Sequence, residues 1–291
     1  MRLFSTSSLK FAICLSVALL ATSPAARHAY GHGAGGDIAI FSTNGKVDIG
    51  FAVLDDQDED QEFFDPTENI FSLVLLPQNP IPAIPWQFGS SEPGFDANEG
   101  ELPTEADISY NLVELRYWDG QSAEVQLGPA TGINAGVAPQ PGKSDTLGGF
   151  HSHPLFGVND PNGTPADGVY VGKLTVSVDG LIDSDPYYMV TLVTGEVTNI
   201  ADRLDPNATA QEIRDAQIAA AEAIGEMARL YADDPAGNPL PIYEGIQGAA
   251  DFTFFSNAIS AVQTEAVPEP TSLALAGILL VGFIGGVRRR R

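Results

Sequence analysis

Two histidines separated by a single residue are the part of this chain best suited to metal chemistry. His151 and His153 flank Ser152, and an extended backbone would point both rings to the same face. Imidazole nitrogens are common zinc ligands, and Asp160 and Asp167 follow closely enough to complete a set of three or four ligands. The alternative is a pair at a strand edge whose imidazoles form hydrogen bonds with loop backbone. The residues alone leave both interpretations open.

A second metal hypothesis concerns calcium. Asp56, Asp58 and Asp60 alternate as they do at the start of a calcium-binding loop. An EF-hand is excluded, because Gln61 stands at the sixth position, where glycine is needed, and Thr67 at the twelfth, where a bidentate glutamate belongs. Two interpretations remain: a looser calcium site formed by these aspartates, or a solvated acidic loop.

The sequence contains none of the common catalytic signatures. It has no G-x-S-x-G elbow, no phosphate-binding loop, no H-E-x-x-H and no dinucleotide fingerprint. We therefore name no catalytic residue and expect a protein that is not an enzyme.

One short segment nevertheless resembles a hydrolase family. Residues 150–154, Phe-His-Ser-His-Pro, resemble the H-x-H-P core of the zinc-dependent JAMM isopeptidases. The resemblance implies zinc ligands at His151 and His153. In that family a serine and an aspartate follow at fixed distances and a separate upstream glutamate acts as the acid/base. Thr164 and Asp167 do not fit that spacing, and the surrounding sequence is typical of strands, whereas that family is α/β.

Composition limits the classes of partner. The 291-residue chain carries a formal net charge of −24, which repels nucleic acid and excludes it as a partner. The single cysteine, Cys14, lies within the apolar N-terminal segment. If that segment is removed, the mature protein has no disulfide and no thiolate metal site.

The N-terminus is typical of a signal peptide. Arg2 and Lys10 form a positively charged region, residues 11–21 are apolar, and Ser23 and Ala25 are small residues suited to signal peptidase. We expect cleavage after Ala25 and hence an exported protein.

The C-terminus has three parts in a fixed order. A short proline-containing motif is followed by an apolar run at residues 273–287, which predicts a transmembrane helix, and then by a basic end. The motif consists of Val267, Pro268, Glu269 and Pro270, and the basic end of Arg288, Arg289, Arg290 and Arg291. The arginines would hold their end of the helix in the cytoplasm.

This tail resembles the PEP-CTERM sorting signal of bacterial exosortase substrates. The resemblance implies processing by an exosortase-type enzyme, at least transient anchoring in the membrane, and delivery to the cell surface or the extracellular matrix. Exopolysaccharide is a further partner that such a destination offers.

Between the two signals, the pattern predicts a mainly β, sandwich-like domain. Short alternating runs separated by glycine, proline and aspartate are typical of this class, and Asn44-Gly45 is a strong hairpin signal. The acidic run at 55–62 is expected to end the first hairpin. The predicted strands lie at residues 38–41, 47–53, 71–76, 110–118, 122–127, 169–178 and 187–193.

One helix is predicted after the strands. Thr209 and Glu212 form a capping box, and residues 213–231 are rich in helix formers. Residues 252–262 are apolar enough to be ordered, with their type left open. The expected apolar face of the helix consists of Ile213, Ala216, Ala220, Ile224, Met227 and Tyr231.

The predicted organisation therefore has four parts. A signal peptide occupies residues 1–25, a β-sandwich-like domain 26–200, an accessory amphipathic helix with its linker 201–266, and the sorting signal with its transmembrane helix 267–291. We expect an exported, surface- or matrix-associated protein that is not an enzyme and binds a divalent metal, zinc or calcium. The alternatives are a secreted metal-dependent hydrolase that uses His151 and His153, and a calcium-stabilised adhesion module.

Overall fold

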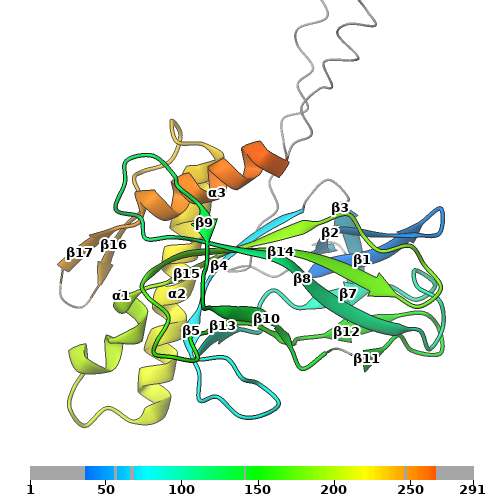
Figure 1. The fold of residues 1–291 in the computed structure, drawn as a ribbon, viewed down its shortest axis with the longest axis horizontal. Coiled ribbons are helices and arrows are strands. Elements are labelled where there is room, and N and C mark those ends of the chain that lie inside the picture. Colours follow the sequence, from blue (N-terminus) through cyan, green and yellow to red (C-terminus); the bar gives the residue numbers. More distant parts are fainter. Residues whose placement is uncertain (1–36, 56–57, 66–68, 141, 246–247, 267–291) are drawn as a thin grey trace, which may run out of the picture.

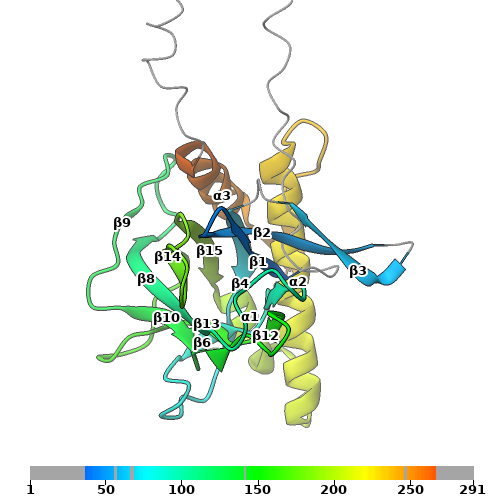
Figure 2. The same cartoon turned by 90° about the vertical axis from the view of Figure 1, so that its right-hand side faces the viewer.

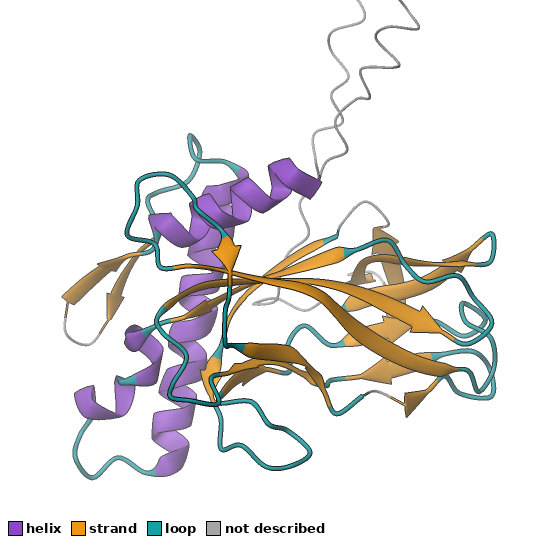
Figure 3. Ribbon diagram, in the orientation of Figure 1, coloured by secondary structure: helices purple, strands orange, loops and turns teal. Residues whose placement is uncertain are grey.

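The computed structural model describes residues 37–55, 58–65, 69–140, 142–245 and 248–266. They form a mainly β protein with three larger sheets, a separate small hairpin and a group of helices (Figures 1 and 3). The predicted signal peptide, the sorting motif, the apolar run and the terminal arginines lie outside the described residues. Among the helices that are described, none is long and apolar enough to cross a membrane.

We call the largest sheet the central sheet. Its strand order is β11 (Gly142–Lys143), β8 (Asp107–Trp118), β14 (Gly168–Val178), β15 (Tyr187–Val193) and β4 (Ile70–Val74), and β9 (Gly128–Pro129) also pairs with β8. All pairings are antiparallel except that of β15 with β4.

The other two sheets contain shorter strands. The histidine-bearing sheet has the order β12 (Phe150–Ser152), β7 (Phe95–Ala97), β1 (Ile38–Thr43), β2 (Lys46–Asp55) and β3 (Asp58–Asp65). The third sheet has the order β10 (Asn134–Ala138), β13 (Leu155–Asn159), β6 (Phe88–Ser90) and β5 (Leu76–Pro77). Figure 2 shows β2 and β3 projecting away from the rest of the molecule.

The helical part follows the sheets in the sequence. It comprises α1 (Gly195–Thr198), a 3-10 turn η1 (Ile200–Arg203), α2 (Ala210–Asp233), the hairpin of β16 (Ile242–Gly245) with β17 (Gly248–Asp251), and α3 (Thr253–Ala266). Residues 252–262, which the sequence left unassigned, thus fall almost entirely within a helix. The fold therefore has a second long helix in addition to the predicted one.

The strands β14 and β15 of the central sheet are covered on both faces. Tyr170 and Leu174 of β14 pack toward the other two sheets, whereas Val169 and Val171 pack toward α2 and α3. All seven residues of β15 are buried, which explains why all of them except Thr191 are apolar or aromatic. Both predicted strands are confirmed, and they pair antiparallel from Gly168 opposite Val193 to Leu174 opposite Tyr187.

The first predicted hairpin is also confirmed. β1 and β2 pair from Ile38 opposite Phe51 to Thr43 opposite Lys46. Asn44 and Gly45 both have positive φ, 55° and 78°, as a two-residue turn matched to the strand twist requires.

The capping box and the helix that it begins are confirmed as well. The Thr209 hydroxyl accepts a hydrogen bond from the Glu212 backbone N–H at 3.2 Å, and the Glu212 carboxylate accepts one from the Thr209 N–H at 2.7 Å. The buried face includes Ala220 and Ile224, as predicted. Met227 and Tyr231 are only half-buried, and the small residues Ala221, Ala228 and Ala232 replace them in the contact with α3 and the sheet.

One predicted strand and the predicted end of the first hairpin were wrong. Residues 122–127 form a loop, in which the Ser122 hydroxyl accepts a hydrogen bond from the Trp118 indole and donates one to the Glu124 carbonyl. These side-chain hydrogen bonds compete with strand pairing, and β8 pairs instead with β9. The acidic run at 55–62 does not end the first hairpin, because β3 begins within it at Asp58 and pairs with β2.

The contact between α2 and the central sheet gives a stability prediction. Ile224 is fully buried, whereas Ile218 on the same helix is 36% exposed. We expect Ile224→Ala to lower the free energy of unfolding by about 3 kcal/mol and Ile218→Ala by less than about 1 kcal/mol, because only the first leaves a cavity. Urea denaturation of the two variants measures this difference. Equal losses would contradict the packing described here.

Candidate metal centre

The two predicted histidines lie at the edge of the histidine-bearing sheet. β12 pairs antiparallel with β7, so that His151 stands opposite Asp96, and His153 follows the strand by one residue. The alternation of the extended backbone brings both rings to the same side, as predicted. Their centroids are 4.9 Å apart and their Nε2 atoms 3.2 Å apart.

Asp37 lies close to both histidines. It directly precedes β1, which runs parallel to β7, and this pairing brings residue 37 to the loop before β7. Its Oδ1 accepts a hydrogen bond from the Gly94 N–H at 2.9 Å, while Oδ2 lies 3.5 Å from Nε2 of His153 and 3.8 Å from Nδ1 of His151. One ligand atom from each of the three side chains lies within 4.8 Å of the others. We call Asp37, His151 and His153 the three-ligand cluster.

Hydrogen bonds on the outer ring nitrogens orient the two imidazoles. Asp96 Oδ2 lies 3.0 Å from Nδ1 of His151, and the Ser91 carbonyl lies 3.3 Å from Nδ1 of His153. An acceptor at Nδ1 favours the tautomer that carries its proton there and leaves the lone pair on Nε2. A carboxylate or carbonyl behind the ring is the usual outer partner of a metal-bound histidine.

The spacing of the inner atoms suits a tetrahedral ion. Zinc–nitrogen and zinc–oxygen bonds of about 2.0–2.1 Å place two ligands of a tetrahedron about 3.3 Å apart. The two observed separations, 3.2 Å between the Nε2 atoms and 3.5 Å from Nε2 of His153 to Oδ2 of Asp37, are close to that value. At this distance one Nε2 can donate a hydrogen bond to the other in one pair of tautomers, and in another pair both can present lone pairs to a cation.

The cluster is buried on one side and open on the other. The Asp37 side chain is 11% exposed, whereas that of His151 is 62% exposed. Asp37 thus lies on the buried side of the cluster, and His151 faces the solvent.

A further carboxylate borders the cluster. Oε1 of Glu92 lies 3.3 Å from Nδ1 of His153. Burial raises the pKa of Glu92 above its ordinary value, and the neighbouring His153 partly opposes that shift. Glu92 is therefore a proton-accepting group beside the cluster that the sequence did not reveal.

Asp160 and Asp167, the carboxylates predicted to complete the site, have other partners in the structure. The Asp160 carboxylate accepts a hydrogen bond from the Asn162 N–H within its own turn. The Asp167 carboxylate accepts one from the Gly195 N–H at the start of α1. The structure does not group either of them with the histidines, because β13 carries the chain after His153 into the third sheet and Asp167 directly precedes β14 of the central sheet.

The predicted calcium ligands cannot be compared in the same way. Asp56 lies outside the described residues, and so do the side chains of Asp58 and Asp60, although the backbone of both belongs to β3. The calcium hypothesis stays a prediction.

Comparison with known proteins bears on the C-terminal tail. Residues 266–291 match the PEP-CTERM protein-sorting motif, which confirms the resemblance seen in the sequence. The chain is therefore an exported protein with a sorting tail, anchored transiently at the membrane and processed by an exosortase-type enzyme. Neither a curated protein nor a solved structure matches the chain.

Gly94 gives a prediction specific to the cluster. A Cβ atom at this position would lie 2.7 Å from the His153 ring and 2.8 Å from Oδ2 of Asp37, so that these side chains would have to move. We expect Gly94→Ala to lower the free energy of unfolding by about 1–3 kcal/mol, as overpacking does. Chemical denaturation measures the loss.

Gly128→Ala is the matched control. A Cβ at Gly128 meets no atom within 4 Å, and we expect a change of less than about 0.5 kcal/mol. A Gly94 variant as stable as the control would contradict the close approach of the loop to the cluster.

Proposed function

We propose that this exported protein binds one zinc ion through Asp37, His151 and His153, and serves as a non-enzymatic metal-binding protein of the cell surface or extracellular matrix. The observation that carries the proposal is the agreement of two independent features. Two of the separations between the ligand atoms, from Nε2 of His153 to Nε2 of His151 and to Oδ2 of Asp37, match the edge of a zinc tetrahedron, and Nδ1 of both histidines has an acceptor.

The donor set favours zinc over calcium. Calcium takes six to eight oxygen ligands, whereas two of the three ligands here are imidazole nitrogens. Zinc accepts a mixed set of nitrogen and oxygen in four-fold coordination.

The exposure of the cluster supports a binding role. Catalytic metals generally lie in clefts that exclude water around the reacting groups. His151 is largely exposed at a sheet edge, where an ion can enter and leave.

The ligand set is testable by substitution. We expect the purified protein to bind one equivalent of zinc by calorimetry, and Asp37→Asn or His153→Ala to weaken binding by at least about tenfold, since each removes a ligand. Asp96→Asn should also weaken zinc binding, by about 10–100-fold, because it removes the charged partner that orients the His151 ring.

Asp160→Asn and Asp167→Asn are the controls, since each removes a carboxylate that the structure places away from the cluster. We expect both to bind zinc as the unmodified protein does. If either of them abolished binding while Asp37→Asn did not, the ligand set argued here would be wrong.

Zinc should also stabilise the fold, because the ligands come from β12 and from the start of β1, which lie on opposite sides of β7. At a free zinc concentration about 100 times the dissociation constant, the gain is about 2.7 kcal/mol. The measurement is the melting temperature with zinc, with calcium and with a chelator. Stabilisation by calcium alone would favour the adhesion module over the proposal.

A metal-dependent hydrolase is the second candidate, and Glu92 is the observation that favours it. A carboxylate whose pKa is raised by burial, next to three metal ligands, has the properties of a general base. Zinc-dependent hydrolysis of model esters or peptides that Glu92→Gln abolishes without loss of bound zinc would establish this activity. Zinc binding without such hydrolysis would leave the binding role.

A further inference from the structure

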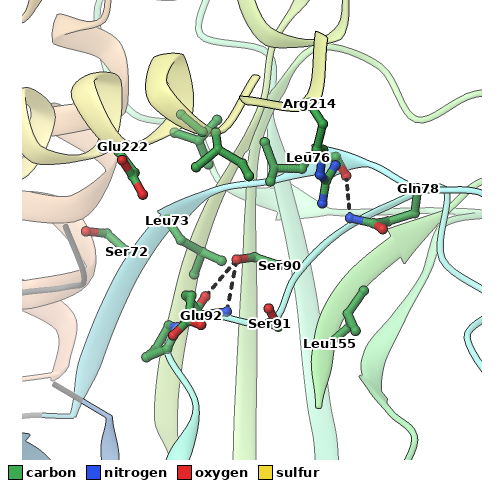
Figure 4. A pocket seen from close by; sticks show the side chains of 15 residues that line it. Ser72, Leu73, Leu76, Gln78, Ser90, Ser91, Glu92, Leu155, Arg214 and Glu222 are labelled. Atoms are coloured by element: carbon green, nitrogen blue, oxygen red, sulfur yellow. Dashed lines mark hydrogen bonds between the residues drawn. The ribbon is translucent and has the colours of Figure 1, made fainter. Parts of the chain in front are cut away.

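A cleft of about 420 Å³ lies between α2 and the strands β4, β5 and β6 (Figure 4). Its volume is within the range of small-molecule sites in proteins. Much of its wall is apolar, formed by Leu73, Leu76 and Leu155 from the strands and by Ile218 from the helix. Ile218 is 36% exposed, so that part of its apolar surface is available to a ligand.

Arg214 supplies the positive charge in this cleft. It projects from the first turns of α2 and lines the cleft (Figure 4). Its Nη1 donates a hydrogen bond to the Pro77 carbonyl at 3.1 Å. Within the described part of the chain, no carboxylate lies within ion-pair distance of its guanidinium. Partial burial lowers the pKa of Arg214, and no acidic neighbour opposes that shift.

The other described cations of this acidic protein have partners. Five of them pair with a carboxylate, and the sixth lies over an aromatic ring: Lys46 with Asp185, Arg116 with Glu265, Lys143 with Asp107, Arg203 with Glu196, Arg229 with Asp233, and Lys173 over Tyr188. A half-buried guanidinium without a protein carboxylate, in a chain of net charge −24, is a group suited to a carboxylate from outside.

We propose that this cleft binds a small amphipathic monocarboxylate, with its carboxylate on Arg214 and its apolar body between Leu73, Leu76 and Ile218. Glu92 and Glu222 also line the cleft, and their negative charges repel an anionic ligand more strongly the more charges it carries, which favours a single carboxylate over several. Because none of the three ligands of the cluster lines this cleft, the proposal does not depend on zinc binding.

Calorimetry with octanoate and octanamide tests this assignment, with chelator present so that metal plays no part. We expect octanoate to bind once per chain and at least about tenfold more tightly than octanamide, because only the carboxylate pairs with the guanidinium. Arg214→Gln should remove this preference, and the control Arg203→Gln, whose guanidinium lies outside the cleft, should keep it.

A second variant tests the location without changing charge. Gly225 lines the cleft, and a Cβ there meets only Val74, at 4.0 Å, so that Gly225→Leu would fill space in the cleft while adding a strong helix former to α2. We expect Gly225→Leu to weaken octanoate binding by at least about tenfold at an unchanged or higher melting temperature. The proposal is overturned if octanoate does not bind saturably, if octanamide binds equally well, or if Arg214→Gln binds octanoate as the unmodified protein does.

Discussion

Burial of both faces of β14 and β15 is the constraint on which the rest of the structure depends. β14 and β15 can be covered on both sides only if one face receives the other two sheets and the opposite face receives α2 and α3. The first packing holds the histidine-bearing sheet in place, and with it the three-ligand cluster. The second sets α2 against β4 and thereby forms the cleft that contains Arg214. Both proposed sites thus depend on the same two strands.

Within that framework, the three-residue strand β7 assembles the cluster. It pairs in parallel with β1 on one side and antiparallel with β12 on the other, so that Asp37 and the two histidines arrive from distant parts of the chain. β7 also carries Asp96, and the loop before it contributes Gly94 and the Ser91 carbonyl. A short strand can do this because its neighbours are themselves anchored in the buried core.

The sequence predicted those features that are encoded locally. The Asn44-Gly45 turn, the capping box at Thr209 and the paired strands β14 and β15 each depend on residues close together in the chain, and all are confirmed. The common face of His151 and His153 also follows from backbone alternation alone. Asp37 could not be predicted, because its place depends on a parallel pairing between strands that are remote in sequence. For the same reason, choosing Asp160 and Asp167 by their distance along the sequence failed to identify Asp37.

The electrostatics of the cluster explain why a cation would be held there. Asp37, Asp96 and Glu92 each lie within 4 Å of an imidazole nitrogen, so that three carboxylates surround the two rings. Like charges this close disfavour one another, most strongly where Asp37 is shielded from water. A divalent cation coordinated by the two Nε2 atoms and Asp37 offsets that repulsion, while the strands that carry the carboxylates keep them from moving apart. The affinity would thus come from a charge arrangement that the fold maintains, and the acidic surface around it would raise the local concentration of cations.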